Sequence, residues 1–136
     1  SESATPVNSI DLFPTLLELA GATLPANDRI DGVSLLPLLR GQELSSRPLF
    51  WHYPHYGNQG GAPGGAVRDG DWKLIEWYED GAFELFNLRE DPSETRNRAA
   101  EMPEKVQELS AKLKAWRTDV AAVMPTPNPR SGDRQP

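Results

Sequence analysis

Two Asp-Gly dipeptides, Asp69-Gly70 and Asp80-Gly81, restrict the fold of this chain more than any other feature of its sequence. Each is typical of a type I′ turn, in which both central residues need a positive φ that Asp and Gly tolerate. Strand-like sequence surrounds them at 66–68, 71–78 and 82–88. The sequence therefore predicts an antiparallel meander built on two tight hairpins.

A further strand is predicted over 48–53, an aromatic segment bounded by Pro48 and Pro54. Proline cannot donate a hydrogen bond to a neighbouring strand, so this strand should lie at an edge of the sheet. The predicted sheet has about four strands.

A long amphipathic helix is predicted from about Pro103 to Val123, where Pro125 would stop it. Its apolar residues are three or four positions apart in alternation and share one stripe, formed by Val106, Leu109, Leu113, Trp116, Val120 and Val123. Such a stripe suits a coiled-coil seam or packing across a sheet. The segment is shorter than the roughly four heptads of a typical coiled coil, which favours packing on the sheet. The predicted fold class is α+β.

A shorter helix is predicted over 9–20, with Ser9 as its N-cap and Gly21 as its left-handed stop. Its apolar face is wide, and so short a helix is not stable alone in water, so it needs a packing partner. The next segment, 22–42, predicts a loop followed by a short helix of roughly two turns around Pro37. After Met124, proline-rich sequence without periodicity predicts a disordered tail over 125–136.

Composition excludes several functions. The chain has 14 Lys and Arg against 20 Asp and Glu, a net charge of −6 mixed along its length, which disfavours a nucleic-acid binder. Without cysteine there is no disulfide, thiolate zinc site or cysteine nucleophile in these residues. No apolar run approaches the ~20 residues of a membrane span.

The candidate site is the segment 51–65, which contains both histidines and five of the 11 glycines. Its imidazole, phenol and amide groups, together with free backbone amides, suit a polar or anionic ligand. The candidate ligand-binding residues are His52, Tyr53, His55, Tyr56, Asn58 and Arg68. The alternative interpretation is a surface loop whose histidines have no function.

Other polar groups give weaker signals. His52 and His55 lie on extended, proline-interrupted backbone with no obvious third ligand, so no metal site is predicted. Arg68 and Lys73 could place positive charge near the loop, or could be solvated or paired with a neighbouring acid. The carboxylates Glu76, Glu79, Asp80 and Glu84 divide between the strand faces and the turn, which favours a solvated acidic edge over paired-carboxylate catalysis.

One near-motif is rejected. Ser46-Arg47-Pro48-Leu49-Phe50 has Ser and Pro at the spacing of the Cys/Ser-x-Pro-x-Arg activation motif of sulfatases, but its fifth residue is Phe50 and a strand follows where that motif leads into a helix. No catalytic residue is assigned in this chain.

Taken in order, the motifs of this chain resemble the C-terminal part of a sulfatase of the arylsulfatase type, in the alkaline-phosphatase-like superfamily. No single motif is specific, whereas the ordered set is. The matching segments are 9–21, 31–35, 51–56, 68–75, 84–88 and 91–94, with Asn97.

This resemblance implies a division of labour. A formylglycine and a calcium or magnesium ion would lie in a preceding α/β catalytic domain, with none of them held by this chain. Residues 1–23 would be the last helix of that domain, 24–47 a connecting segment and 48–124 the C-terminal subdomain, which packs on the catalytic domain. His52 and His55 would then help to wall the pocket for a sulfate ester. Related enzymes are often exported, so a periplasmic or secreted location is expected.

A second hypothesis belongs to another functional class. The chain could be a non-catalytic module that binds a glycan or a protein through the loop 51–65. Ligand-dependent stabilisation of the chain alone would favour this alternative, whereas exposed apolar surface relieved by an upstream domain would favour the sulfatase.

Overall fold

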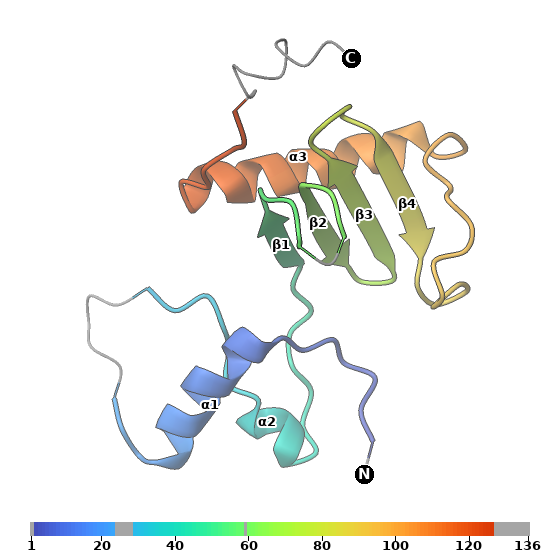
Figure 1. Ribbon diagram of the computed structural model, residues 1–136. Coiled ribbons are helices and arrows are strands. Elements are labelled where there is room, and N and C mark those ends of the chain that lie inside the picture. The colour runs from blue at the N-terminus through green and yellow to red at the C-terminus, as the bar shows by residue number, and fades with distance from the viewer. Residues whose placement is uncertain (1, 24–28, 59, 127–136) are drawn as a thin grey trace. The chain divides into compact units, whose positions relative to one another are not determined.

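The computed structural model describes residues 2–23, 29–58 and 60–126. The chain forms two compact units, residues 1–46 and 47–136 (Figure 1), and each is described by itself. Most of the predicted tail over 125–136 lies outside the described residues.

The second unit contains the four-stranded sheet. Its strands are β1 (Leu49–Tyr53), β2 (Gly64–Asp69), β3 (Trp72–Trp77) and β4 (Phe83–Asn87). They are antiparallel and lie in the order β1-β2-β3-β4, with the helix α3 (Pro103–Asp119) across one face (Figure 1). The α+β fold, the meander and the edge position of the first strand are therefore confirmed.

Both hairpins form, but neither has the predicted turn. Asp69 pairs with Trp72, so the first loop consists of Gly70 and Asp71, and only Gly70 has a positive φ. This pattern is that of a type II′ turn, which needs glycine at the first central position. The second connection spans residues 78–82, and it is closed by a hydrogen bond from the amide of Gly81 to the carbonyl of Trp77.

The core lies between α3 and the sheet. Val67, Leu74 and Leu85 from three strands pack against Leu109 and Leu113 of α3, and all five are almost completely buried. Phe50 and Trp116 extend this core toward β1, where their rings stack 4.9 Å apart. The helix therefore packs on the sheet as the stripe predicted, and the coiled-coil alternative is wrong for this unit.

The end of α3 differs from the prediction. The helix stops at Asp119 and not near Val123, because Ala121 adopts a left-handed φ of 50°. The amides of Ala121 and Ala122 then bond to the carbonyls of Thr118 and Arg117, which is the Schellman pattern. Alanine at this position carries no sequence signal, since glycine is the usual residue there. Val123 is consequently off the helix and 80% exposed.

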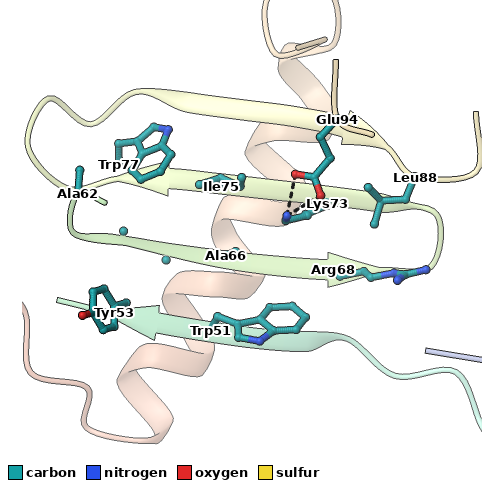
Figure 2. Close-up of a pocket in the computed structure, with 12 residues that line it drawn as sticks. Trp51, Tyr53, Ala62, Ala66, Arg68, Lys73, Ile75, Trp77, Leu88 and Glu94 are labelled. Atoms are coloured by element: carbon teal, nitrogen blue, oxygen red, sulfur yellow. Dashed lines mark hydrogen bonds and ion pairs between the residues drawn. The ribbon is translucent and has the colours of Figure 1, made fainter. Parts of the chain in front are cut away.

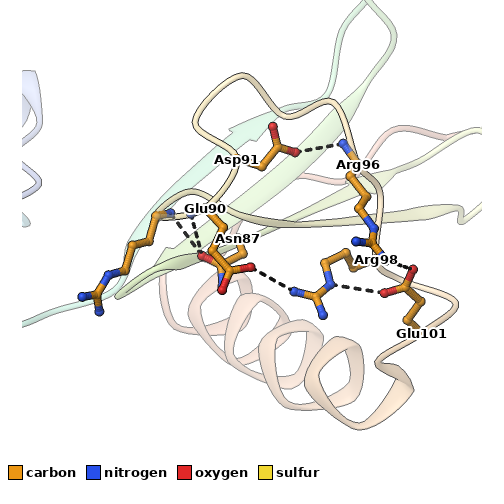
Figure 3. Close-up of polar contacts among 7 residues, drawn as sticks. Asn87, Glu90, Asp91, Arg96, Arg98 and Glu101 are labelled. Atoms are coloured by element: carbon orange, nitrogen blue, oxygen red, sulfur yellow. Dashed lines mark hydrogen bonds and ion pairs between the residues drawn. The ribbon is translucent and has the colours of Figure 1, made fainter.

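The connection from β4 to α3 is ordered by side-chain hydrogen bonds in place of secondary structure (Figure 3). The carboxylate of Asp91 accepts hydrogen bonds from the amides of Arg96 and Thr95, both at 2.8 Å, and these bonds lower the pKa of Asp91. The Asn97 side chain accepts a hydrogen bond from the Leu85 amide of β4. The Arg98 guanidinium lies between the carboxylates of Glu90 and Glu101. This segment therefore has mainly a structural role.

The first unit contains the 3-10 turn η1 (Ser9–Asp11), the helix α1 (Leu12–Leu19) and the single helical turn α2 (Leu36–Leu39). The N-cap of η1 is Asn8 and not the predicted Ser9, and the Asp11 carboxylate accepts a hydrogen bond from the Asn8 amide. The other Asp11 oxygen accepts one from the Val33 amide, which ties the later segment to α1. Gly32 permits this approach, since a Cβ there would overlap with the backbone of residue 10.

The predicted stop at Gly21 is confirmed by its φ of 63°. The apolar face of α1 is largely exposed within this chain, with Leu16 63% accessible. The other exposed large apolar residues of η1 and α1 are Ile10, Leu12, Phe13 and Leu19. None of the described helices is long and apolar enough to cross a membrane.

Candidate functional site

The face of the sheet opposite α3 carries a groove of about 450 Å³, here called the open-face groove. Alternation along the strands directs one set of side chains to this face. Trp51 and Tyr53 come from β1, Ala66 and Arg68 from β2, and Ile75 and Trp77 from β3. Figure 2 shows these side chains on the near face, with α3 behind the sheet.

Glycine hollows the groove at one end. Gly64 pairs with Trp77, and a Cβ on Gly64 would lie only 3.3 Å from the indole ring and 3.0 Å from the carbonyl oxygen of Glu76. The indole therefore lies against the bare backbone of β2. Trp51 and Tyr53 on the neighbouring strand are 42% and 53% exposed. This end of the groove is apolar and aromatic.

The other end of the groove carries charge. The Lys73 ammonium donates hydrogen bonds to both carboxylate oxygens of Glu94, each at 2.7 Å, and both side chains are mostly buried. Glu94 adopts an unusual φ of 55°. Beside this pair, Nε of Arg68 donates to the carbonyl of Gly70 at 3.3 Å. Lys73 is thus paired with an acid, as the favoured interpretation predicted, but that acid is Glu94 and not one of the neighbouring acids in the sequence.

His52 lies on the opposite face, toward α3. Its Nε2 is 2.9 Å from the carbonyl oxygen of Val123 and its Nδ1 is 2.7 Å from the hydroxyl of Tyr78. A carbonyl only accepts, so Nε2 carries a proton, and in the neutral ring Nδ1 accepts from the Tyr78 hydroxyl. Both ring nitrogens of His52 are therefore engaged within the domain.

Tyr78 lies between His52 and an ion pair on the side of the sheet that α3 covers. Burial raises the pKa of Tyr78, while the neighbouring Arg117 partly opposes this. The Arg117 guanidinium lies over the Tyr78 ring and 2.8 Å from the Glu76 carboxylate, with both charged side chains largely buried. Glu76 is therefore an internal ion-pair partner, which corrects the prediction of a solvated acidic edge at this position.

The loop after β1 presents the other candidate residues. The ring of His55 is exposed and meets Tyr53 edge to face, with centroids 5.7 Å apart. The Tyr56 hydroxyl donates to the Glu79 carboxylate at 2.6 Å, and this bond raises the pKa of Tyr56. Asn58 is exposed.

The structure thus separates the predicted site residues. Tyr53 and Arg68 line the open-face groove, and His55 contacts Tyr53, whereas His52 points to the other face. Sequence reasoning missed Trp51 and Trp77 as groove residues. The alternation of side chains along β3 could have identified Trp77, because it places Trp77 on the same face of the sheet as Lys73 and Ile75.

In the described part of the chain, no group of three or more His, Asp and Glu side chains is arranged to hold a metal ion.

Residues 1–121 match the family model described as N-sulphoglucosamine sulphohydrolase, C-terminal. The chain is 38% identical over 125 residues to a sulfatase of Formosa agariphila, a match that covers 81% of this chain and 23% of that protein. It is also 38% identical over 122 residues to arylsulfatase K of Xenopus laevis, covering 82% of this chain and 22% of that protein.

A solved sulfatase structure also resembles the fold of this chain. A solved 2-O GAG sulfatase superposes on 93% of this chain with a TM-score of 0.70 and 29% identity, and the match covers 28% of that protein. The chain spans less than a quarter of the length of the two sequence relatives.

Proposed function

Because the chain belongs to the family of N-sulphoglucosamine sulphohydrolase C-terminal domains, we propose that it serves as the C-terminal domain of a sulfuric ester hydrolase. The observation that carries this proposal is the family match over 1–121, supported by two sulfatases that are 38% identical to this chain. The likeness to a 2-O GAG sulfatase favours a sulfated sugar as the substrate.

The catalytic groups would come from the rest of that enzyme. These 136 residues contain no cysteine, and the segment 46–50 is not the activation motif, because Phe50 stands where that motif has arginine. A formylglycine and a calcium or magnesium ion, which the family implies, would therefore be held outside this chain. The chain by itself is expected to show no hydrolysis of sulfate esters, and robust turnover by the purified chain would refute this part of the proposal.

Within the domain, His55 is the histidine best placed to meet a substrate. Its ring is exposed on the loop that follows β1, and Tyr53 orients it by an edge-to-face contact. An imidazole N–H can donate to a sulfate oxygen, and such hydrogen bonds to an anion are stronger than neutral ones. His52, by contrast, uses both ring nitrogens inside the domain, so we assign it a positioning role beneath the loop.

The two histidines can be separated in the complete enzyme. His55→Ala should lower kcat/KM for a sulfate ester by roughly 10-fold or more, the loss of one charge-assisted hydrogen bond, with no change in stability. His52→Ala should lower stability, because it removes the bonds to Tyr78 and Val123. Unchanged kinetics for His55→Ala would reject its role at the substrate. Stabilisation of the isolated chain by a saccharide would favour the binding-module alternative.

A further inference from the structure

Two segments that are distant in the sequence meet at one end of the sheet. The loop over 54–63 and the connection over 78–82 leave the sheet at the same end, because Tyr53 and Trp77 both pair with Gly64. The loop carries the histidine proposed above to meet the substrate, and the connection carries two exposed carboxylates. These carboxylates therefore lie at the end of the sheet where the substrate is expected.

We propose that Glu79, in the connection between β3 and β4, determines which sulfated saccharides the enzyme accepts. The sugar next to the sulfated ring packs on Tyr56 and is uncharged, because the Glu79 carboxylate repels a carboxylate or sulfate group at this position. This inference rests on the proposed function, since it requires that the sulfate ester lies at His55.

Tyr56 presents an exposed aromatic ring in a fixed position. The residue is 68% exposed, and its hydroxyl donates a hydrogen bond of 2.6 Å to the Glu79 carboxylate. The loop also holds its own shape, with hydrogen bonds from the Gly57 amide to the Gly61 carbonyl and from the Gly60 amide to the Gly57 carbonyl. A ring that is already held loses little conformational entropy when a ligand packs on it. Aromatic rings are common linings of ligand sites, and the apolar face of a sugar can pack on them.

The polar groups that surround the Tyr56 ring offer a ligand hydrogen-bond acceptors. The Tyr56 hydroxyl already donates its proton to Glu79, and an ionised carboxylate only accepts. Asp80 adds a second negative charge, and one of its oxygens accepts a hydrogen bond of 2.9 Å from the Ala82 amide. Sugar hydroxyl groups can donate to such acceptors, whereas carboxylate and sulfate groups are repelled. This surface therefore fits an uncharged sugar.

His55 and Tyr56 are adjacent in the chain but are held by different elements. The His55 ring contacts Tyr53 of β1, whereas the Tyr56 hydroxyl reaches Glu79 beyond β3. Neighbouring residues thus carry a donor for a sulfate oxygen and a platform for the next sugar. The negative charge of Glu79 acts on the second of these positions.

Two disaccharides that differ in one group test this inference on the complete enzyme. Both contain the same 6-O-sulfated glucosamine, and the second ring is glucose in one and glucuronate in the other. The wild type is expected to show the higher kcat/KM for the glucose disaccharide. Glu79→Gln should lower the ratio of the two kcat/KM values by roughly 3- to 10-fold at low ionic strength. The glutamine oxygen can still accept the Tyr56 hydrogen bond, so the loop keeps its shape.

Asp71→Asn is the matched control, because it removes the same charge at the opposite end of β3. At about 3.3 Å per residue, the six residues of β3 separate the two positions by roughly 20 Å. The Asp71 side chain is 54% exposed and lies 3.8 Å from Arg89, a surface contact that contributes little to stability. Asp71→Asn should leave the ratio of the kcat/KM values within about two-fold of the wild type. Equal shifts of the ratio in Asp71→Asn and Glu79→Gln, or a wild type without preference, would overturn the proposal.

Two further measurements separate this inference from the proposed function. Hydrolysis of 4-nitrophenyl sulfate tests the sulfatase itself: an enzyme that hydrolyses sulfate esters but treats both disaccharides alike supports the proposed function and rejects the role of Glu79. A protein that hydrolyses none of these esters rejects the proposed function. Calorimetric Kd values for the two disaccharides then decide the role of Glu79. A preference for the glucose disaccharide that Glu79→Gln lowers by roughly 3- to 10-fold supports it, whereas equal Kd values, or no binding of either disaccharide, would overturn it.

Discussion

Gly65 is the position where the smallest substitution should have the largest structural effect. It lies on the face of β2 that α3 covers, opposite His52 in the register of the sheet. A Cβ at this position would overlap with the Tyr78 hydroxyl oxygen and lie 3.2 Å from ring atom Cζ. Gly65→Ala should therefore push the Tyr78 ring away and break its hydrogen bond to His52.

The expected cost has two parts. Overpacking a well-filled site typically costs about 1–3 kcal/mol, and loss of one intramolecular hydrogen bond costs about 1 kcal/mol. Gly65→Ala should thus lower the free energy of unfolding by about 2–4 kcal/mol. Tyr78→Phe removes the hydroxyl that causes the overlap and should itself cost about 1 kcal/mol.

In the Tyr78→Phe background, Gly65→Ala should be close to neutral. The strand conformation at Gly65 has no positive φ, and alanine restricts the unfolded chain more than glycine does. The double-mutant cycle should therefore give a coupling of about 2–4 kcal/mol. Urea unfolding followed by tryptophan fluorescence measures it, because all four tryptophans lie in the second unit. An equal cost of Gly65→Ala in both backgrounds would refute the steric argument.

Two other predictions follow from the ion pairs. Arg117→Met leaves the largely buried Glu76 carboxylate without its partner and should lower the free energy of unfolding by roughly 3 kcal/mol. The double variant Glu76→Gln/Arg117→Met should recover part of this loss, because it also removes the buried charge. If urea denaturation shows no recovery of stability in the double variant, the buried-charge explanation is wrong. Hydrogen bonds from Lys105 and then Lys112 lower the pKa of Glu108 from 4.5 to about 2. Its contribution to stability should thus be complete above pH 4.5 and disappear as the pH falls toward 2, and an NMR titration of the carboxylate with its midpoint at 4.5 would contradict this.

The sequence was sufficient for the elements of the second unit because their signals are local. Asp-Gly dipeptides bounded the strands, and the stripe through Leu109 and Leu113 marked the helix face. The turn types were wrong because a dipeptide does not say which residue pair closes the hairpin: pairing of Asp69 with Trp72 moved the loop by one residue. The end of α3 was wrong because Ala121 takes a conformation that usually belongs to glycine.

The candidate site was harder to predict for a different reason. In β1 both faces carry aromatic residues, Phe50 and His52 on one and Trp51 and Tyr53 on the other, so hydrophobicity does not reveal which face α3 covers. That choice depends on a contact distant in sequence, the stacking of Phe50 on Trp116. The pairing of Lys73 with Glu94 depends equally on the path of the chain after β4. Local patterns therefore predict which residue types form the site, but not which face of the sheet their side chains occupy.

Tyr53 pairs directly with Gly64, so the segment between them can be exchanged without changing the pairing of β1 with β2. Residues 54–63 leave and re-enter the sheet at adjacent positions, so their length is not tied to the hydrogen bonds of the strands. Doubling the length of a flexible loop costs only about 0.6 kcal/mol in closure entropy. Selection, or a laboratory library, could therefore replace this segment while the sheet, α3 and the bonds of His52 stay unchanged. The sheet and α3 thus form a frame that tolerates changes in the length of this segment.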